Sequence, residues 1–249
     1  MAGKSDFLFG IRSVIEAIRS GKEIEKVLVK KGLQGELYEE LVATMKEAKI
    51  AWQEVPLDRI NRATRKNHQG VIAFVSAITY QDIENVLIGL FEEGKNPLIL
   101  VLDGITDIRN MGAIARSAEC AGVHAIVIPE KGGAPINADA VKTSAGALYN
   151  IPVSRVQNLY KALEYLKNSG LKIVAATEKG SNDYTKIDFT GPTAIVLGAE
   201  DTGVSAQVLK ICDQGAKIPI VGSIGSLNVS VAAGVLVYEV VRQRSLASE

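Results

Sequence analysis

Three polar side chains with the chemistry of a ligand site, Asn110, Glu200 and Asn228, lie in glycine-containing loops in the part of the chain beyond residue 98. Each loop comes after a short apolar run typical of a buried strand and leads into a helical pattern. Such a strand-to-helix turn is a usual place for a ligand in an α/β protein. Arg116 is six residues beyond Asn110, so its long side chain can lean back toward the loop. Taken alone, each segment also fits a capped helix with polar groups in solvent.

The third loop is the richest in small and hydrogen-bonding residues. Gly222 and Gly225 allow a tight turn or a close approach of a ligand to the backbone. Ser226 and Asn228 favour helix N-cap positions, so the helix predicted over residues 229–242 begins with free N–H groups beside two polar side chains. Capping alone requires fewer such residues, and the excess indicates a function.

Alternating strands and helices must position these loops. From residue 98 onward, short apolar runs alternate with helical patterns, which predicts a mostly parallel sheet with helices on both faces. The predicted strands are 98–102, 125–128, 172–176, 194–197 and 216–219.

The pattern divides the chain into three parts. Residues 1–76 alternate short helical and strand-like segments, which predicts a small α/β domain. Residues 77–96 are predicted to be a linker with one amphipathic helix, ended by polar and helix-breaking residues. Residues 97–249 hold the strand-helix repeats, and the fold class is α/β.

Charge is balanced over the whole chain but uneven along it. The 28 Lys and Arg residues equal the 28 Asp and Glu residues, so overall charge gives no support for nucleic-acid binding. Basic residues nevertheless crowd positions 59–68, and a local basic face can bind phosphates on a neutral protein. On its own such a cluster also fits a solvated surface. The candidate RNA contacts are Arg59, Arg62, Arg65 and Lys66.

Several classes of protein are disfavoured. No apolar run approaches the roughly 20 residues that span a bilayer, and no G-x-x-x-x-G-K-[ST], strand-linked G-x-G-x-x-G or G-x-S-x-G motif is present. The sequence has only two histidines, His68 and His124, and no C-x-x-C motif. We therefore expect no metal site. Cys120 and Cys212 lie in apolar helical patterns, which predicts buried free thiols. With no signal-peptide core at the N-terminus, we expect a cytoplasmic protein.

The three loops together carry a family signature. In chain order they contain Asn-x-Gly-x-x-x-Arg, Leu-Gly-Ala-Glu-x-x-Gly and Ile-Pro-x-x-Gly-x-x-x-Ser-Leu-Asn-Val-Ser-Val-Ala. This order resembles the three motifs of the SpoU-type RNA 2′-O-ribose methyltransferases of the SPOUT superfamily and extends over most of residues 98–244. The N-terminal part is similar to the family's substrate-binding domain, which is related to small RNA-binding ribosomal proteins, through Phe9-Gly10 and residues 67–71.

The resemblance implies a C-terminal domain with a deep trefoil knot, which general topology rules would not predict. It also implies S-adenosylmethionine bound in the knot and a homodimer. The residues implied to line the methyl-donor site are Leu197, Gly198, Ile218, Gly222, Ser226 and Leu227. The residues implied to be catalytic are Asn110, Arg116, Glu200, Ser226 and Asn228.

The implied reaction is in-line attack of a ribose 2′-oxygen on a sulfonium methyl group, with the reactants held about 3 Å apart. The hydroxyl needs a base or a strong local field. An arginine has been given the role of base in the family, but a guanidinium stays protonated at neutral pH, which disfavours that role. We expect Arg116 to clamp the target phosphate and to stabilise alkoxide charge. Asn110 and Ser226 would orient the ribose, and Glu200 would fix Arg116 or Asn110 or accept the proton.

The target is less well defined than the reaction. The subgroup that the chain resembles most methylates a guanosine in the P loop of bacterial 23S rRNA. Methylation of tRNA or of another rRNA loop is an alternative, since the motifs identify the reaction better than its target. A ribosome-assembly or RNA-binding factor without catalysis is an alternative of another class, which the intact Asn110, Arg116 and Glu200 disfavour.

Overall fold

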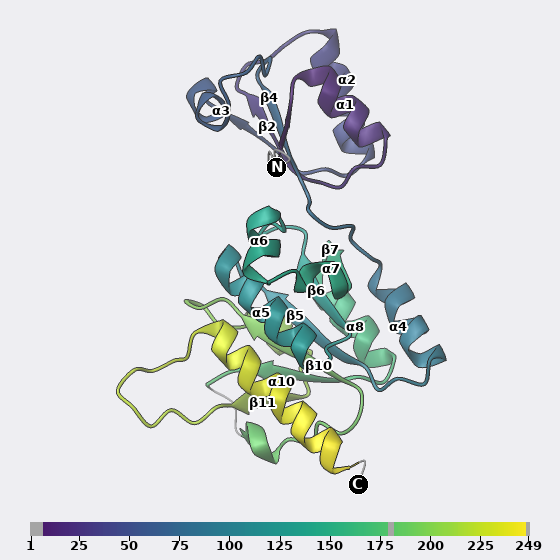
Figure 1. Ribbon diagram of the computed structural model, residues 1–249, viewed down its shortest axis with the longest axis vertical. Coiled ribbons are helices and arrows are strands. Elements are labelled where there is room, and N and C mark those ends of the chain that lie inside the picture. The colour runs from purple at the N-terminus through teal and green to yellow at the C-terminus, as the bar shows by residue number, and fades with distance from the viewer. Residues whose placement is uncertain (1–6, 179–181, 248–249) are drawn as a thin grey trace. The chain divides into compact units, whose positions relative to one another are not determined.

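The computed structural model describes residues 7–178 and 182–247. The chain forms two compact units. One comprises the residues up to Thr79 together with Pro135–Ala138, and the other comprises Tyr80–Ala134 and the chain from Asp139 onward. Each unit has its own sheet and its own hydrophobic core (Figure 1).

The first unit is built on a four-stranded sheet. Its elements are β1 (Phe7–Phe9), α1 (Ile11–Arg19), β2 (Ile24–Lys30), α2 (Glu36–Glu47), β3 (Trp52–Val55), α3 (Leu57–Ala63) and β4 (Val71–Val75). The strand order is β1-β4-β2-β3, with β2 parallel to β3 and antiparallel to β4. Because side chains alternate along a strand, the sheet has two different faces. On one face Val27 and Ala73 pack with Leu41 of α2, and on the other Leu28 packs with Ile60 of α3.

The second unit contains the predicted α/β sheet, and the α/β class is confirmed. The elements that follow along the chain are α4 (Ile83–Glu92), β5 (Leu98–Asp103), α5 (Ile108–Cys120), β6 (Ala125–Pro129), α6 (Ala138–Thr143), α7 (Ala147–Asn150), β7 (Val153–Val156), α8 (Leu159–Asn168), β8 (Lys172–Ala176), β9 (Asn182–Asp183), the 3-10 helix η1 (Tyr184–Lys186), β10 (Thr193–Gly198), α9 (Ala206–Leu209), β11 (Gln214–Lys217) and α10 (Val229–Leu246). The strand order is β7-β6-β5-β10-β8-β11-β9, and every pairing in it is parallel.

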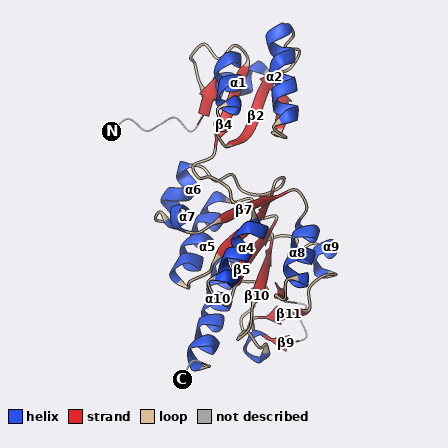
Figure 2. Cartoon of the chain, turned by 90° about the vertical axis from the view of Figure 1, so that its right-hand side faces the viewer, coloured by secondary structure: helices blue, strands red, loops and turns tan. Residues whose placement is uncertain are grey.

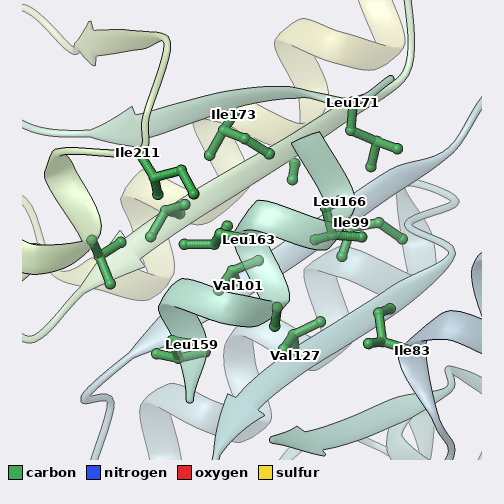
Figure 3. Packing of buried hydrophobic residues seen from close by; sticks show 14 of the residues in the cluster. Ile83, Ile99, Val101, Val127, Leu159, Leu163, Leu166, Leu171, Ile173 and Ile211 are labelled. Atoms are coloured by element: carbon green, nitrogen blue, oxygen red, sulfur yellow. The ribbon is translucent and has the colours of Figure 1, made fainter. Parts of the chain in front are cut away.

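Helices cover both faces of this parallel sheet. α8 lies on one side of it, and α5 and α10 lie on the other (Figure 2). On the α8 side, Leu163 and Leu166 point toward Ile99 and Val101 of β5 (Figure 3). Ile83 of α4 joins the same core, so the helix within the segment predicted as a linker packs into the second unit. Within the described ranges 7–178 and 182–247, no helix is long and apolar enough to cross a membrane.

Four of the five predicted strands lie within one residue of their predicted limits, as β5, β6, β8 and β10. The fifth, predicted over residues 216–219, is displaced toward the N-terminus and ends at Lys217. Pro219 has no N–H to donate to a neighbouring strand, which explains why pairing stops there. Residues 218–228 form the long loop between β11 and α10 (Figure 1).

The prediction of two buried thiols is wrong for Cys120, which is exposed at the last residue of α5. Cys212 is half-buried, and burial raises the pKa of its thiol to about 11. Because the thiolate is the reactive form, we expect one fast-reacting thiol in the native protein at neutral pH. Titration with a thiol reagent checks this: Cys120→Ser should remove the fast phase, and denaturant should release the second thiol. A fast phase that persists in Cys120→Ser would contradict the burial of Cys212.

The C-terminal end of α10 is held by the guanidinium group of Arg244. Its Nε donates to the carbonyl oxygen of Phe189 (3.2 Å), and its Nη1 donates to that of Asn96 (2.7 Å). Its Nη2 donates to the carbonyl oxygens of Pro97 (3.1 Å) and Gly191 (2.8 Å). A guanidinium presents its donors in a rigid fork, so one side chain fixes two segments that are far apart in sequence.

Replacing Arg244 should therefore destabilise the second unit. Arg244→Ala removes all four of these hydrogen bonds, and among the described contacts only the carbonyls of Pro97 and Gly191 keep another donor, from Thr193. We expect a loss of about 2–4 kcal/mol in the free energy of unfolding. Arg244→Lys should lose less, because an ammonium group still reaches some of the carbonyls. Urea unfolding followed by circular dichroism measures both. Lys161→Ala, which removes an exposed cation of α8, is the control and should change stability by no more than about 0.5 kcal/mol. Equal losses in Arg244→Ala and Lys161→Ala would contradict the role of Arg244.

Candidate active site

The first turn of α5 carries Asn110. The N-cap of this helix is Asp107. Its Oδ1 accepts hydrogen bonds from the backbone N–H groups of Arg109 (2.6 Å) and Asn110 (3.3 Å). Aspartate is as good a cap as asparagine and stands where the chain enters the helix. The side-chain amide of Asn110 is thereby available for other partners.

Asn110, Glu200 and Asn228 form a hydrogen-bonded triad. Asn110 Nδ2 donates to Glu200 Oε1 over 2.9 Å. Asn228 Nδ2 donates to Glu200 Oε1 over 2.7 Å and to Asn110 Oδ1 over 3.0 Å. Asn110 lies in the first turn of α5, Glu200 in the loop after β10 and Asn228 at the end of the loop after β11. These segments follow β5, β10 and β11, which run parallel in one sheet. The sheet thus brings together three of the five predicted catalytic residues.

Asn228 is itself held in one orientation. It is the N-cap of α10, and its Oδ1 accepts from the backbone N–H (2.9 Å) and the hydroxyl (2.5 Å) of Ser230. The amide nitrogen must therefore face Glu200 and Asn110. Ser230 was not predicted as a site residue, although Asn followed two residues later by Ser is a recognisable capping pattern. Among the described contacts none uses Glu200 Oε2, so this oxygen and the second N–H of Asn110 can meet a ligand.

The loop that carries Glu200 is fixed at both ends. Gly198 ends β10 in register with Asp103, the last residue of β5. Asp103 Oδ2 accepts from the backbone N–H of Ser205 (2.7 Å), which anchors the far end of the loop. Ala199 pairs with Gly203 in a short bridge between the two ends. Sequence analysis also missed Asp103, because its partner is 102 positions away.

A cavity of about 390 Å³ opens beside this loop. Among the described lining residues, Glu178, Glu200 and Asp201 are acidic and none is basic. Gly222, which was predicted to line the methyl-donor site, is exposed and does not belong to the lining. The other five predicted members do line the cavity: Leu197, Gly198, Ile218, Ser226 and Leu227.

A second cavity of about 290 Å³ adjoins the first. It is lined by the loop between β5 and α5, by Asn110 and by Glu200. Ala199, Glu200, Asp201 and Val229 line both cavities. Glu200, which accepts both hydrogen bonds of the triad, therefore stands where the two cavities adjoin.

Arg116 lies apart from the triad. It is exposed on α5, and within residues 7–178 and 182–247 no hydrogen bond or ion pair of its side chain joins it to Asn110 or Glu200. Six residues correspond to about 600° of helical rotation, so Arg116 projects roughly 120° away from Asn110 around α5. The expectation that its side chain leans back toward the loop is not met in this structure.

The predicted RNA contacts gather around α3 in the first unit. α3 ends at Ala63, so Arg65 and Lys66 lie in the loop beyond the helix. Arg62 and Arg65 line one open groove together with Asn61. His68 fixes this loop: its Nε2 lies 2.9 Å from Asn61 Oδ1, and its Nδ1 accepts from the backbone N–H of Gly70 (2.9 Å).

Family comparisons agree with this geometry. Residues 97–238 match the model of the SpoU rRNA Methylase family. The chain belongs to the SpoU rRNA methylase family. Residues 7–81 match the model for RNA 2′-O ribose methyltransferase substrate binding. The resemblance inferred from the three loops is confirmed, and this SpoU family member is an RNA methyltransferase.

Individual proteins of known family are also similar to this chain. Over 249 residues it is 33% identical to YacO of Bacillus subtilis (strain 168), a protein assigned to the TrmH family of tRNA/rRNA methyltransferases, with 100% of both chains covered. Its fold matches the SpoU methyltransferase AviRb from Streptomyces viridochromogenes in complex with AdoMet, with TM-score 0.61 and 26% identity over 96% of this chain and 90% of that chain. It also matches the A. aeolicus TrmH/SpoU tRNA modifying enzyme, with TM-score 0.56 and 32% identity over 66% of this chain and 85% of that one.

Proposed function

We propose that this SpoU family member transfers the methyl group of S-adenosylmethionine to a ribose 2′-oxygen in ribosomal RNA, at a guanosine of the P loop of 23S rRNA. The observation that carries the proposal is the triad at the junction of the two cavities. It offers an amide N–H and a carboxylate oxygen to a hydroxyl group at the place where a donor and an acceptor would meet. Such a substrate would place the enzyme in the cytoplasm, as the sequence predicts.

The larger cavity fits S-adenosylmethionine. Ile218 and Leu227 supply apolar contacts for an adenine ring, and the backbone at Gly198 allows close approach. Glu178 and Asp201 suit a ligand that carries sulfonium and ammonium charges. When bound, this cofactor supplies the electrophilic methyl group. AviRb, a structural neighbour solved with AdoMet, supports the assignment.

The second cavity would hold the target ribose, oriented by Asn110 in its own lining and by Ser226 from the adjoining larger cavity. Glu200 binds both amides of the triad through one oxygen, so its first task is to position Asn110 and Asn228. Arg116 would hold the target phosphate with two parallel hydrogen bonds and stabilise the alkoxide charge. If Arg116→Lys kept nearly full turnover and unchanged RNA affinity, this bidentate clamp would be refuted.

Glu200→Gln separates positioning from proton transfer. A glutamine carbonyl can still accept from both asparagine amides, so we expect Glu200→Gln to keep kcat within about tenfold of the wild type. Glu200→Ala removes the acceptor, and we expect kcat to fall by about 100-fold, because small misplacements of reacting groups cost that much. Steady-state methyl transfer at saturating RNA gives both values. Equal inactivity of the two variants would instead make Glu200 the proton acceptor.

We further propose a homodimer. Large apolar side chains are exposed on α10 and on the loop before it: Val221 (99%), Ile224 (76%), Val231 (51%) and Tyr238 (52%). A cluster of this kind fits a protein contact better than water. α10 packs against α5, the helix that carries Arg116. The trefoil knot implied by the family resemblance stays a prediction.

The function is tested by methyl transfer from labelled S-adenosylmethionine to unmodified 23S rRNA and to bulk tRNA. We expect label on a ribose of 23S rRNA, lost in Arg116→Ala and kept in Arg109→Ala, which removes another exposed arginine of α5. Label on tRNA alone would keep the reaction and change the target. Cofactor binding without transfer to either RNA would favour a particle substrate or a non-catalytic assembly factor.

A further inference from the structure

The first unit has a sheet face on which aromatic and basic side chains lie side by side. This is the face that carries α3, opposite α1 and α2 (Figure 1). Phe7 of β1 is in register with Phe74 of β4, and Phe74 is in register with Lys26 of β2. Register partners point to the same side of a sheet, so these three residues form one row across three strands.

α3 covers the part of this face next to the row, so the row itself lies beside the helix and is not covered by it. Ile60 of α3 is fully buried against Leu28 and Ile72, whereas Phe7 and Phe74 are only partly buried. The ring centroid of Phe7 lies 6.4 Å from that of Phe74, with the rings inclined at 57°. Such tilted packing holds aromatic rings in place, so a ligand would meet a preformed surface.

The charge of this face is positive. Lys66 Nζ lies 5.6 Å from the ring centroid of Phe9, the next residue of β1 on this side, in a cation–π contact. Lys26 and Lys30 share the face. The strand residues that pairing places on this side in the described part of the first unit are Phe7, Phe9, Lys26, Leu28, Lys30, Gln53, Val55, Ile72 and Phe74, none of them acidic. Glu25 lies in the bulge between Ile24 and Lys26 and is the one carboxylate of β2 next to this row.

We propose that Phe7, Phe74, Lys26 and Lys66 form a binding surface for unpaired nucleotides of the RNA substrate. Aromatic rings bordered by cations suit single-stranded RNA, because every base has a face that stacks and every linkage carries a charge. Bases stack on Phe7 and Phe74, and phosphates approach Lys26 and Lys66. A duplex hides its base faces and gains only the charge contacts. The proposal rests on the proposed function in taking RNA as the substrate.

Binding of the full chain to a short unstructured oligoribonucleotide containing 2-aminopurine tests the stacking. We expect the wild type to quench the fluorophore and to bind this RNA more tightly than a blunt RNA duplex of the same length. The double variant Phe7→Leu, Phe74→Leu keeps apolar side chains but loses the rings. Its affinity for the single strand should fall about 5- to 100-fold, with little change for the duplex.

Two further variants keep the test decisive. Trp52→Leu is the matched control, because Trp52 is an exposed aromatic residue (37%) aligned with Val27 on the opposite face, and it should bind like the wild type. The double variant Lys26→Ala, Lys66→Ala leaves the aromatic packing in place. It should reduce the slope of log affinity against log salt by about 1.4 for the single strand. Circular dichroism and melting temperature confirm folding of each variant.

The proposed surface would be refuted if the phenylalanine variant bound the single strand as tightly as the wild type. It would also be refuted if Trp52→Leu lost as much affinity as the phenylalanine variant. Wild-type binding that does not distinguish the single strand from the duplex would refute it as well. Methyl transfer by the same preparations keeps the two proposals apart. If the wild type methylates no RNA, the proposed function is refuted. The oligonucleotide binding measurements then still test the proposed RNA-binding surface. Normal methyl transfer with unchanged oligonucleotide binding in the variants refutes the surface alone.

Discussion

Gly198→Ala is expected to abolish methyl transfer and to weaken binding of S-adenosylmethionine by about 100-fold or more. A Cβ atom at this position would lie 2.0 Å from the carbonyl carbon of Gly203, 2.1 Å from the amide nitrogen of Val204 and 2.3 Å from the carbonyl oxygen of Gly203. Carbon atoms in contact need about 3.5 Å, so the loop after β10 must move by more than an ångström. That loop carries Glu200 and lines both cavities.

Calorimetric titration of the cofactor and a methyl-transfer assay measure the two effects. Gly89→Ala is the matched control, because Gly89 lies in α4 and an added Cβ meets no atom within 4 Å. It should leave cofactor binding unchanged and raise the free energy of unfolding by about 0.5–1 kcal/mol, as alanine favours helix over glycine. Normal cofactor binding by Gly198→Ala would mean that the loop does not follow the path described.

The strands that hold the site could be predicted because each central strand is buried on both faces. β5 and β10 are therefore nearly continuous apolar runs, with Leu98 to Leu102 and Thr193 to Gly198 almost free of solvent contact. β7 and β9 went unpredicted for the opposite reason. β7 has four residues, two of them Ser154 and Arg155, and β9 has two polar residues at the far edge of the sheet. Such short edge strands carry too few residues for a pattern.

The site itself was predictable as a set of residues but not as a set of contacts. The motifs single out Asn110, Glu200 and Asn228, and hydrogen bonds join all three. Spacing cannot show that Ser230 orients Asn228 or that Asp103 anchors the Glu200 loop across 102 positions. Spacing also cannot show which residue caps α5, because Asp107 and Asn110, three positions apart, have the same capping chemistry.

Arg116 poses the largest remaining question, and mixing two inactive variants should answer it. Arg116 is exposed on α5 and points about 120° away from Asn110 around the helix. In the proposed homodimer the exposed apolar side chains of α10 are covered by the second copy, which brings a second triad into the assembly. We therefore expect Arg116 of one copy to serve the triad of the other, with each site built from both chains.

Arg116→Ala and Asn228→Ala should each be inactive alone. In a dimer that contains one of each, one site combines an intact triad with an intact arginine, and the other site lacks both. Random exchange makes half of the dimers mixed, so the mixture should recover about one quarter of wild-type activity. Methyl transfer after co-refolding or co-expression, compared with each parent at equal total concentration, measures the recovery.

The pair Asn110→Ala and Asn228→Ala is the control. Both residues belong to the same triad, since Asn228 Nδ2 donates to Asn110 Oδ1 within one chain. Every site in their mixed dimer lacks one member, so no activity should return. Recovery in this pair as well would mean that the triad itself is shared between copies. If the Arg116→Ala mixture stays inactive while mixed dimers are present, Arg116 serves the triad of its own chain. The α5 loop would then have to rearrange when RNA binds, because about 120° of helix rotation separates Arg116 from Asn110 in this structure.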